Sequence, residues 1–561
     1  MRKFVSIIIL ILVVSMGLSQ ISCTDAGGDQ TTHDTEVTTT KTQTEDKKPV
    51  TPTYISSVPK AKIQAKSIYT VNEPDSFSDK LALASLQGLV ANKCEDQILI
   101  KNASFENFQP YFFSTWKCRQ NTTVDSKSIN LENLIAHYKD NISGYILCSF
   151  DEKSESGSVA VSLAGLLDAI VVTPTNKKLC EKVGLTCLLD ATNLDDAWLR
   201  SSEYFDQLNK DIAFEQATSM APKLVDYAVM SKSYFNFYNG NNANEHAKMF
   251  EFLNDGAIVF GYNNTLGEYH TVLSFSKENI QMVPADHAYN LSTLSGFTLD
   301  TLTQKTEEVS DKESSSVHTV CVVLSDGDNL QWMTNDFTTS NKWWSNQNRG
   351  KFAMGWGIPA TMIDVAPVAS KYLYSKMTKM DEFIVQLSGL GYTFPSKWSP
   401  SERDAMAKTL AEYMKRVDAS YAEILDDKGF NKETLSSFTK QDGIDGLFYI
   451  DYSNYAGMSG KILWSDGKPI VSARYRLWAD VSGGSIEEIA NSINAASTDP
   501  TKASSYSFII VHAWSGLENG KLAQNGNTMD AVAKLVQSLG TNVEVVTPTE
   551  FMNRIVENNA K

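Results

Sequence analysis

Residues 319–329 have the sequence TVCVVLSDGDN, in which a run of apolar and β-branched residues is followed at once by serine, glycine and two aspartates. An uninterrupted run of this kind is typical of a strand buried on both faces, as strands are in parallel sheets covered by helices. The glycine and the acids predict a turn at the carboxyl end of that strand. The stretch therefore predicts a parallel α/β fold with acidic groups at one edge of its sheet.

The same alternation of strand and helix recurs through the C-terminal half of the chain. Further strands are expected at 352–358, 383–387, 446–450, 470–473, 508–512 and 543–546. Helical periodicity lies between several of them, at 401–416, 485–495 and 529–539. Together these units predict a (β/α) barrel-like domain of seven or eight strands. An open, doubly wound sheet is the alternative.

The N-terminal half has shorter strand candidates with amphipathic stretches between them. Strands are expected at 97–101, 144–150, 169–173, 257–261 and 280–283, and helices at 79–90 and 244–253. Between Leu299 and Ser316 the chain becomes polar and charged and has few core-forming residues. We therefore interpret residues 55–300 as an N-terminal α/β domain and residues 315–561 as the C-terminal domain. We recognise no internal sequence repeat in either half.

The start of the chain predicts export. Residues 1–22 have two basic residues before an apolar run that is too short to span a bilayer comfortably, which is typical of a signal peptide. Residues 21–23, ISC, resemble the end of a lipobox, although Gln20 stands where an apolar residue is usual. Residues 23–54 are rich in threonine and poor in large apolar residues, so we expect a disordered tether. These features predict a secreted protein or a surface lipoprotein, attached to a membrane only through a lipid on Cys23.

The net charge of the chain disfavours polyanionic partners. The chain has 50 Lys and Arg against 66 Asp and Glu, a formal net charge of −16. A nucleic acid or an anionic membrane surface would need a basic face to displace its counterions. We expect no nucleic-acid partner.

The ends of the predicted C-terminal strands gather polar and aromatic residues. In a parallel barrel the residues that follow the strands share one mouth, where catalysis in such barrels takes place. A single aspartate there is often only a helix cap, but two aspartates two residues apart repel each other unless a cation, a substrate or a partner stabilises them. The residues expected at this mouth are Asp326, Asp328, Asn329, Trp356, Asp451, Arg474, His512 and Trp514.

Several motifs resemble one known family. Residues 389–395, GLGYTFP, resemble the signature of the GxGYxYP family of putative glycoside hydrolases, and residues 325–332, SDGDNLQW, are similar to its C-terminal domain. Residues 84–90, ASLQGLV, and the segments PAD at 284–286 and NLS at 290–292 resemble its N-terminal domain. The resemblance implies an exported protein that acts on carbohydrate, and it carries over no catalytic residue. Phe394 replaces the second tyrosine of the signature, so any role of that hydroxyl is absent here.

The signature also has a physical interpretation of its own. Gly389 and Gly391 predict a turn with positive φ or a close approach of the backbone to a ligand. Tyr392 offers a flat face and one hydroxyl, which suits a sugar. The alternative is a tight structural turn with Tyr392 packed beneath a loop.

Glycoside hydrolysis needs a carboxylic acid that protonates the leaving oxygen and a carboxylate that acts as base or nucleophile. We place Asp326 or Asp328 on one side of the mouth and Asp451 on the other, with His512 and Arg474 orienting them. Besides Arg474, the substrate-binding residues are expected to be Tyr392, Trp356, Trp514, Asn329 and, from the N-terminal domain, Glu268.

Two other functions use the same residues. A non-catalytic, glycan-binding surface lipoprotein would need the aromatic mouth but no pair of acids. A polysaccharide deacetylase-like hydrolase would fit Ser325-Asp326-Gly327 and His512, but the seven histidines are scattered singly, so no transition-metal site is expected. We expect no cofactor, with Ca²⁺ at Asp326 and Asp328 left open.

Overall fold

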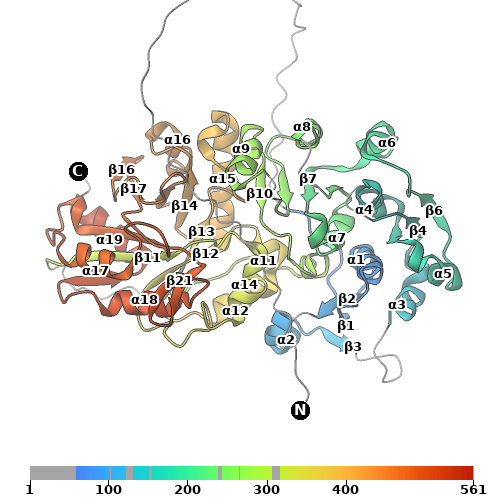
Figure 1. Ribbon diagram of the computed structural model, residues 1–561, viewed down its shortest axis with the longest axis horizontal. Helices are drawn as coiled ribbons and strands as arrows, with labels where there is room; N and C mark the ends of the chain where they lie inside the picture. Colours follow the sequence, from blue (N-terminus) through green and yellow to red (C-terminus); the bar gives the residue numbers. More distant parts are fainter. Residues whose placement is uncertain are drawn as a thin grey trace, which may run out of the picture. The chain divides into compact units, whose positions relative to one another are not determined.

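The computed structural model describes residues 58–101, 103–121, 130–150, 154–237, 243–263, 266–305 and 316–559 (Figure 1). The predicted signal peptide and tether, with Cys23, lie outside these residues, as do residues 306–315 of the predicted domain boundary. Within the described ranges, none of the helices combines the length and the apolar character that crossing a bilayer requires.

The N-terminal region, which we predicted to be α/β, contains three small parallel sheets. Their strand orders are β2-β1-β3, β5-β4-β6 and β10-β9-β7-β8. In each, the first strand in the chain lies between the two that follow it. The strands are β1 (Ser67–Asn72), β2 (Asp96–Lys101), β3 (Arg119–Asn121), β4 (Gly144–Leu147), β5 (Ala169–Val172), β6 (Cys187–Asp190), β7 (Asn209–Glu215), β8 (Ser233–Asn236), β9 (Ile258–Phe260) and β10 (Gln281–Val283).

Three helices, each following the first strand of its sheet, pack against one another at backbone distance. A Cβ added to Gly88 of α1 would lie 2.2 Å from the carbonyl oxygen of Asp226 in α7, and one added to Gly165 of α4 would lie 2.1 Å from that of Val229. Only glycine permits such an approach. The helices of this region are α1 (Phe77–Ala91), α2 (Ala103–Trp116), α3 (Leu131–Tyr138), α4 (Ser156–Leu167), α5 (Pro174–Lys182), α6 (Asp196–Ser201), α7 (Val225–Ser231), α8 (Ala243–Phe252), α9 (Glu268–Lys277) and α10 (Leu291–Leu294).

The C-terminal domain is built on one curled, mostly parallel sheet with the order β16-β17-β15-β14-β13-β12-β11-β19-β18, and β22 also pairs with β11. Two elements depart from the parallel arrangement: β16 pairs antiparallel with β17, and β20 and β21 form a separate small hairpin. The strands are β11 (His318–Leu324), β12 (Met354–Pro359), β13 (Asp381–Gln386), β14 (Tyr421–Asp426), β15 (Gly446–Asp451), β16 (Ile462–Ser465), β17 (Lys468–Ser472), β18 (Tyr475–Leu477), β19 (Tyr506–Val511), β20 (Ser515–Glu518), β21 (Lys521–Gln524) and β22 (Val543–Val546).

The segment from β17 to β18 joins the two ends of this sheet. β17 pairs with β15, whereas β18 pairs with β19. Between them, Ala473 N donates to Tyr449 O and Arg474 N donates to Phe508 O, each at 2.9 Å. The sheet therefore curls into the barrel-like form expected from the sequence, and the predicted α/β fold class is confirmed.

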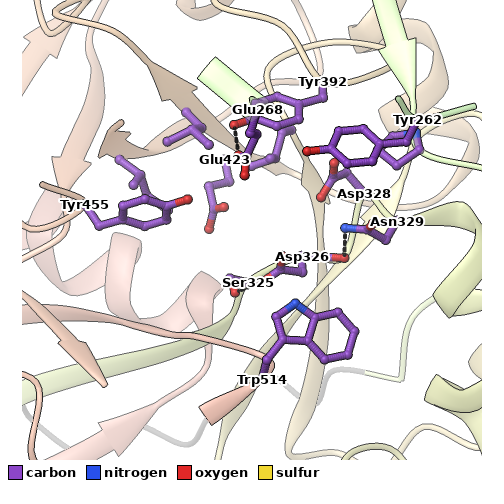
Figure 2. Close-up of a pocket in the computed structure, with 14 residues that line it drawn as sticks. Tyr262, Glu268, Ser325, Asp326, Asp328, Asn329, Tyr392, Glu423, Tyr455 and Trp514 are labelled. Carbon is purple, nitrogen blue, oxygen red and sulfur yellow. Dashed lines mark hydrogen bonds between the residues drawn. The ribbon is translucent and has the colours of Figure 1, made fainter. Parts of the chain in front are cut away.

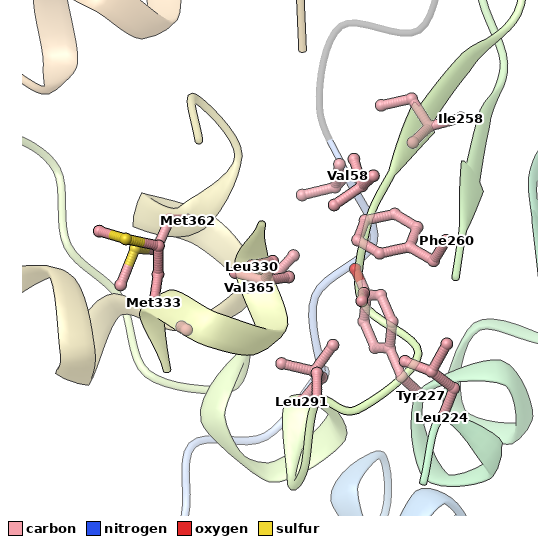
Figure 3. Packing of buried hydrophobic residues seen from close by; sticks show 14 of the residues in the cluster. Val58, Leu224, Tyr227, Ile258, Phe260, Leu291, Leu330, Met333, Met362 and Val365 are labelled. Atoms are coloured by element: carbon pink, nitrogen blue, oxygen red, sulfur yellow. The ribbon is translucent and has the colours of Figure 1, made fainter. Parts of the chain in front are cut away.

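Helices cover the outside of the curled sheet, and one core continues into the N-terminal region. Tyr227, Phe260 and Leu291 of the N-terminal region belong to the same buried hydrophobic cluster as Leu330 and Met362, and Figure 3 shows part of this cluster. The C-terminal helices are α11 (Leu330–Met333), α12 (Asp336–Thr339), α13 (Met362–Val365), α14 (Pro367–Ser375), α15 (Pro400–Arg416), α16 (Lys432–Thr439), α17 (Ile486–Asn494), α18 (Thr528–Gln537) and α19 (Pro548–Asn559).

Candidate active site

A cavity of about 210 Å³ lies at the carboxyl ends of the barrel strands, where α9 and the segments after β9 and β10 of the N-terminal region meet them (Figure 2). Four of its wall residues are acids and four are aromatic. The lining residues are Tyr262, Glu268, Pro284, Ser325, Asp326, Asp328, Asn329, Leu387, Tyr392, Glu423, Leu425, Ile450, Tyr455 and Trp514.

Asp326 and Asp328 come from the turn that follows β11. Asp326 has a left-handed φ of 64°, a conformation in which aspartate is among the few tolerated side chains. Gly327 packs so closely on β12 that an added Cβ would lie 2.3 Å from the carbonyl carbon of Gly357. Its amide donates to Gln386 Oε1 at 2.8 Å. The turn is therefore fixed, and it presents both carboxyl groups to one cavity.

Glu268 reaches the cavity from the first turn of α9. Tyr392 donates its hydroxyl to Glu268 Oε1 at 2.8 Å, and Figure 2 shows this pair on one wall of the cavity. The two residues lie 124 positions apart in the sequence, in different regions of the chain. The site is thus assembled from both halves of the protein.

Glu423 is the fourth acid, and it lies within β14 instead of after a strand. Its side chain is 0% exposed, and neither carboxylate oxygen accepts a hydrogen bond from a described residue. The nearby Gln386 side chain donates from its amide nitrogen to Leu324 O at 3.0 Å, and its oxygen accepts the amide of Gly327. Glu423 therefore contributes a buried carboxyl group with free hydrogen-bonding capacity, and the Gln386 amide is a polar neighbour of it.

Burial and mutual repulsion raise the pKa of Glu268, Asp328 and Glu423. Burial, together with repulsion from the Asp326 and Glu268 carboxylates, raises the pKa of Asp328 to about 8. Burial also raises the pKa of Glu423 well above its usual range; the Gln386 amide opposes the rise, and repulsion from Asp328 and Asp326 adds to it. The pKa of Glu268 rises through burial, although the Tyr392 hydroxyl opposes the rise. At neutral pH the cavity thus holds at least one protonated carboxyl group, which is what an acid catalyst needs.

The signature segment positions Tyr392 by joining the third N-terminal sheet. Tyr392 exchanges two backbone hydrogen bonds with Met282 of β10, at 2.6 and 3.2 Å. A Cβ on Gly391 would lie 2.6 Å from Met282 O, and one on Gly389 would lie 2.3 Å from Gln281 Oε1. Neither glycine has a positive φ. The close approach that the sequence predicts is therefore made to β10 of the N-terminal region.

Models of one family match most of the described chain. Residues 316–556 match the GxGYxYP putative glycoside hydrolase C-terminal domain. Residues 210–296 match the GxGYxYP third domain, and residues 142–208 match the GxGYxYP_N second domain. The chain belongs to the GxGYxYP family. The resemblance noted in the signature is confirmed, and the two N-terminal matches coincide with the second and third of the three sheets.

Solved structures include one that is similar over almost the whole chain. It is a putative hydrolase from Bacteroides thetaiotaomicron VPI-5482, with 28% identity and a TM-score of 0.78 over 89% of this chain and 96% of that chain. A 4-alpha-glucanotransferase from Thermococcus litoralis has 12% identity and a TM-score of 0.29 over 42% of this chain and 40% of that chain, a similarity too slight to support an argument. No curated protein matches the chain.

Six of the residues predicted to form the site of this GxGYxYP protein do line the cavity. They are Glu268, Asp326, Asp328, Asn329, Tyr392 and Trp514. Sequence reasoning missed Tyr262, Glu423 and Tyr455. Tyr455 could have been predicted from the sequence, because it lies in the polar and aromatic segment that follows β15.

Asp451 does not line the cavity, contrary to its predicted place opposite Asp326 and Asp328. It is 3% exposed, and its Oδ1 accepts the backbone amide of Ser453 at 3.1 Å. Its backbone also pairs with Tyr455. Asp451 thus shapes the turn that brings Tyr455 to the cavity.

His512 lies just beside the cavity without lining it. Its ring stacks on Trp478 with centroids 3.9 Å apart, and its Nδ1 is 2.9 Å from Ser515 Oγ. Burial lowers the pKa of His512, and the attraction of Asp326 opposes that change. His512 is therefore close enough to Asp326 for an electrostatic interaction, but Trp478 and Ser515 hold its ring in place.

Trp356 points away from the mouth, so its predicted place in the binding site is wrong. Its side chain is 0% exposed, and its indole nitrogen donates to Asp381 Oδ1 at 2.9 Å. Asp381 is the first residue of β13, at the opposite end of the strands from the mouth. The indole is part of the core.

Arg474 also points to the opposite end of the barrel. Its guanidinium donates to the carbonyl oxygens of Tyr506 at 3.0 Å, Gly460 at 3.2 Å and Ala503 at 3.0 Å. Tyr506 begins β19. Arg474 lies where the backbone crosses from β15 to β19. Its hydrogen bonds connect the chain segments that meet there.

The acids of the cavity are spread over its walls. Among the described residues, no group of three or more His, Cys, Asp and Glu side chains is arranged to hold a metal ion. Ca²⁺ at Asp326 and Asp328 stays a prediction that ligand binding would have to test.

Proposed function

We propose that the protein is a glycoside hydrolase in which Asp328 is the proton donor and Asp326 is the partner carboxylate. The observation that carries this proposal is that Asp328, which is buried and has a pKa raised to about 8, lines one cavity with a second carboxyl group on the same fixed turn. The family description and the hydrolase of similar structure support it.

The chemistry follows from the two roles. Asp328 gives its proton to the glycosidic oxygen as the bond from that oxygen to the anomeric carbon breaks. Asp326 stabilises the positive charge that develops on the sugar, either by attacking the anomeric carbon or by taking a proton from the water that does so. The hydroxyl of Ser325 donates to Asp326 Oδ2, which orients this carboxyl group. Water completes the reaction and restores both groups.

Substrate would be held by the remaining wall residues. Trp514 lines the cavity and is only partly buried, so its indole face is available for stacking against a sugar ring. Tyr262 and Tyr455 direct their hydroxyls inward in Figure 2. Glu268, fixed by Tyr392, can accept a hydrogen bond from a sugar hydroxyl.

The decisive experiment incubates the purified protein with a panel of plant, host and microbial glycans and follows released reducing ends. D328N and D326N are expected to lower kcat by about 10²- to 10⁴-fold, the usual contribution of a proton-transfer residue. D451N is the matched control, because Asp451 is an equally buried strand-end acid outside the cavity, and kcat should change far less. Binding of a glycan without cleavage by the wild type would instead indicate a glycan-binding protein.

We also propose that the protein is exported and anchored through a lipid on Cys23, on the sequence features of residues 1–54. Mass spectrometry of the mature protein tests this. A chain that begins at Cys23 with a lipid mass is the expected result, and a chain that retains residues 1–22 would contradict export.

A further inference from the structure

The ionisable residues that line the cavity are all acids or tyrosines. Glu268, Asp326, Asp328 and Glu423 are the acids, and the fourteen lining residues include no lysine, arginine or histidine. A sugar that carries a carboxylate or a sulfate would meet only like charge or neutral groups there. The cavity therefore disfavours acidic sugars.

Glu423 gives a second and independent indication of the ligand. It is fully buried, both its oxygens lack hydrogen-bond donors among the described residues, and it lies on the wall of the cavity. A buried carboxyl group in this state is costly unless a ligand satisfies it. The group that satisfies it best is a hydrogen-bond donor with positive charge, because a cation beside Glu423 favours the ionised carboxylate and so displaces the proton that burial otherwise retains.

The aromatic residues favour the same kind of group. Tyr262, Tyr455 and Trp514 surround the acids, as Figure 2 shows, and the faces of such rings attract cations. The cavity volume of about 210 Å³ is below the range of about 300–1,000 Å³ that is usual for drug-sized ligands. It suits a single ring with a small substituent.

We infer that the cavity takes a sugar residue with a free, protonated amino group, such as glucosamine, whose ammonium group is received by Glu423. This inference rests on the proposed glycoside hydrolase function and names its substrate class. The ammonium group donates to the unpartnered oxygens of Glu423 and offsets the charge of the neighbouring acids. An N-acetyl group removes that charge, so the acetylated sugar loses both contacts.

Binding is measured by calorimetry at one pH with glucosamine, N-acetylglucosamine, glucose and glucuronate. Glucosamine is expected to bind at least about tenfold more tightly than N-acetylglucosamine or glucose, which corresponds to about 1.4 kcal/mol, and glucuronate is expected to bind most weakly. E423Q should reduce the preference for glucosamine over glucose to about twofold or less. E402Q is the matched control, because Glu402 is also buried with an unpartnered oxygen but lies outside the cavity.

Equal binding of the three uncharged or cationic sugars would overturn the inference, as would an amine preference that survives in folded E423Q. The comparison of sugars on the wild type decides the matter even if E423Q does not fold. Ca²⁺ alone is a further arm, and tighter binding of Ca²⁺ than of glucosamine at the same site would also overturn it. Because binding needs no turnover, the two proposals fail separately: cleavage without amine preference refutes this inference alone, and amine preference without cleavage of any glycosaminyl bond refutes the hydrolase.

Discussion

Asp328 illustrates how one residue acquires its chemistry from its surroundings. An aspartate at a strand end is ordinarily a solvated cap, but this one is 3% exposed and has Asp326 on the same turn. Both conditions oppose ionisation, and they raise its pKa to about 8. The spacing of the two acids in the sequence indicates their repulsion. It does not indicate the burial that makes the larger contribution.

The first prediction concerns the pH dependence of activity. A proton donor must be protonated, so kcat/KM should fall as pH rises through about 8, the pKa of Asp328 in the free enzyme. A pH profile measured on the best substrate of the glycan panel checks this. An activity that stays level from pH 7 to pH 10 would remove Asp328 from the role of acid.

The same proton affects stability. An unfolded aspartate has a pKa of about 3.9, so the folded state holds this proton more tightly, and folding stability falls as pH rises from about 4 to about 8. D328N has no such proton to lose. The melting temperature of D328N minus that of the wild type should therefore increase steadily over this interval, as scanning calorimetry would measure. A constant difference would show that Asp328 is not held protonated in the fold.

Replacing Arg474 should affect the stability of the protein and not its activity. It donates three hydrogen bonds to backbone carbonyls away from the mouth. R474A should lower the free energy of unfolding by about 1–3 kcal/mol, measured by denaturant titration, and should leave kcat/KM within about twofold. A selective loss of activity at unchanged stability would restore the binding role that the sequence suggested.

Among the elements, the signature segment at residues 389–395 has a structural role that its residue types do not indicate. Tyr392 extends the third N-terminal sheet by pairing with β10, and Leu390 N donates to Gln281 Oε1 at 2.7 Å. Ser276 Oγ of α9 accepts Phe394 N at 2.9 Å. The segment thus joins the barrel to the N-terminal region and, through the same contacts, sets Tyr392 against Glu268.

Replacing Gly391 tests this role. In G391A the new Cβ would lie 2.6 Å from Met282 O, so the segment must move away from β10. We expect a lower melting temperature and at least a tenfold loss of kcat/KM, because Tyr392 would no longer hold Glu268. Gly457→Ala is the control, since Gly457 is exposed, lacks a positive φ and has its nearest neighbour, Asn454 Cβ, at 3.3 Å. A neutral G391A would mean that the glycine is dispensable for docking.

The elements also show why sequence reasoning missed part of the site. Most expected strands of the barrel are present, because buried parallel strands are continuous apolar runs. β14, with the sequence YAEILD, interrupts that pattern with Glu423, which is buried for the sake of the cavity. Glu423 therefore both lines the cavity and breaks the apolar pattern by which β14 could have been recognised in the sequence. Trp356 and Arg474 were misplaced for a related reason: alternation along a strand determines the face of a side chain, but not the end toward which a long side chain extends.

At the scale of the whole molecule, the N-terminal region is a structural repeat that our sequence analysis did not recognise. Ser85 Oγ of α1 accepts Val171 N of β5, and Ser162 Oγ of α4 accepts Phe235 N of β8, both at 2.9 Å. The two helices share the pattern Ser-Leu-x-Gly-Leu, at 85–89 and 162–166. Five residues in two short helices are a weak signal beside the different lengths and loops of the units, so only the contacts reveal the repeat.

The third unit keeps the contact and changes the residue. Asp226 Oδ2 of α7 accepts Ser292 N at 2.9 Å, so each helix satisfies a backbone amide of an element outside its own β-α-β unit. All three polar side chains are buried. The repeat therefore joins its units through buried hydrogen bonds, and the third unit in turn carries Glu268 to the cavity. Stability of the N-terminal region and geometry of the site are linked in this way.

The last prediction follows from that equivalence. S85A and S162A each leave one buried backbone amide without an acceptor, which should cost about 1–3 kcal/mol of unfolding free energy in each case. The control is S231A, because Ser231 Oγ donates only to carbonyls of its own helix and pairs with Ser233 Oγ, so no amide loses its partner. Denaturant titration should give similar losses for the two variants and a loss below about 0.5 kcal/mol for the control. Strongly unequal losses would mean that the two serines are similar in position only, and that the units are not energetically equivalent.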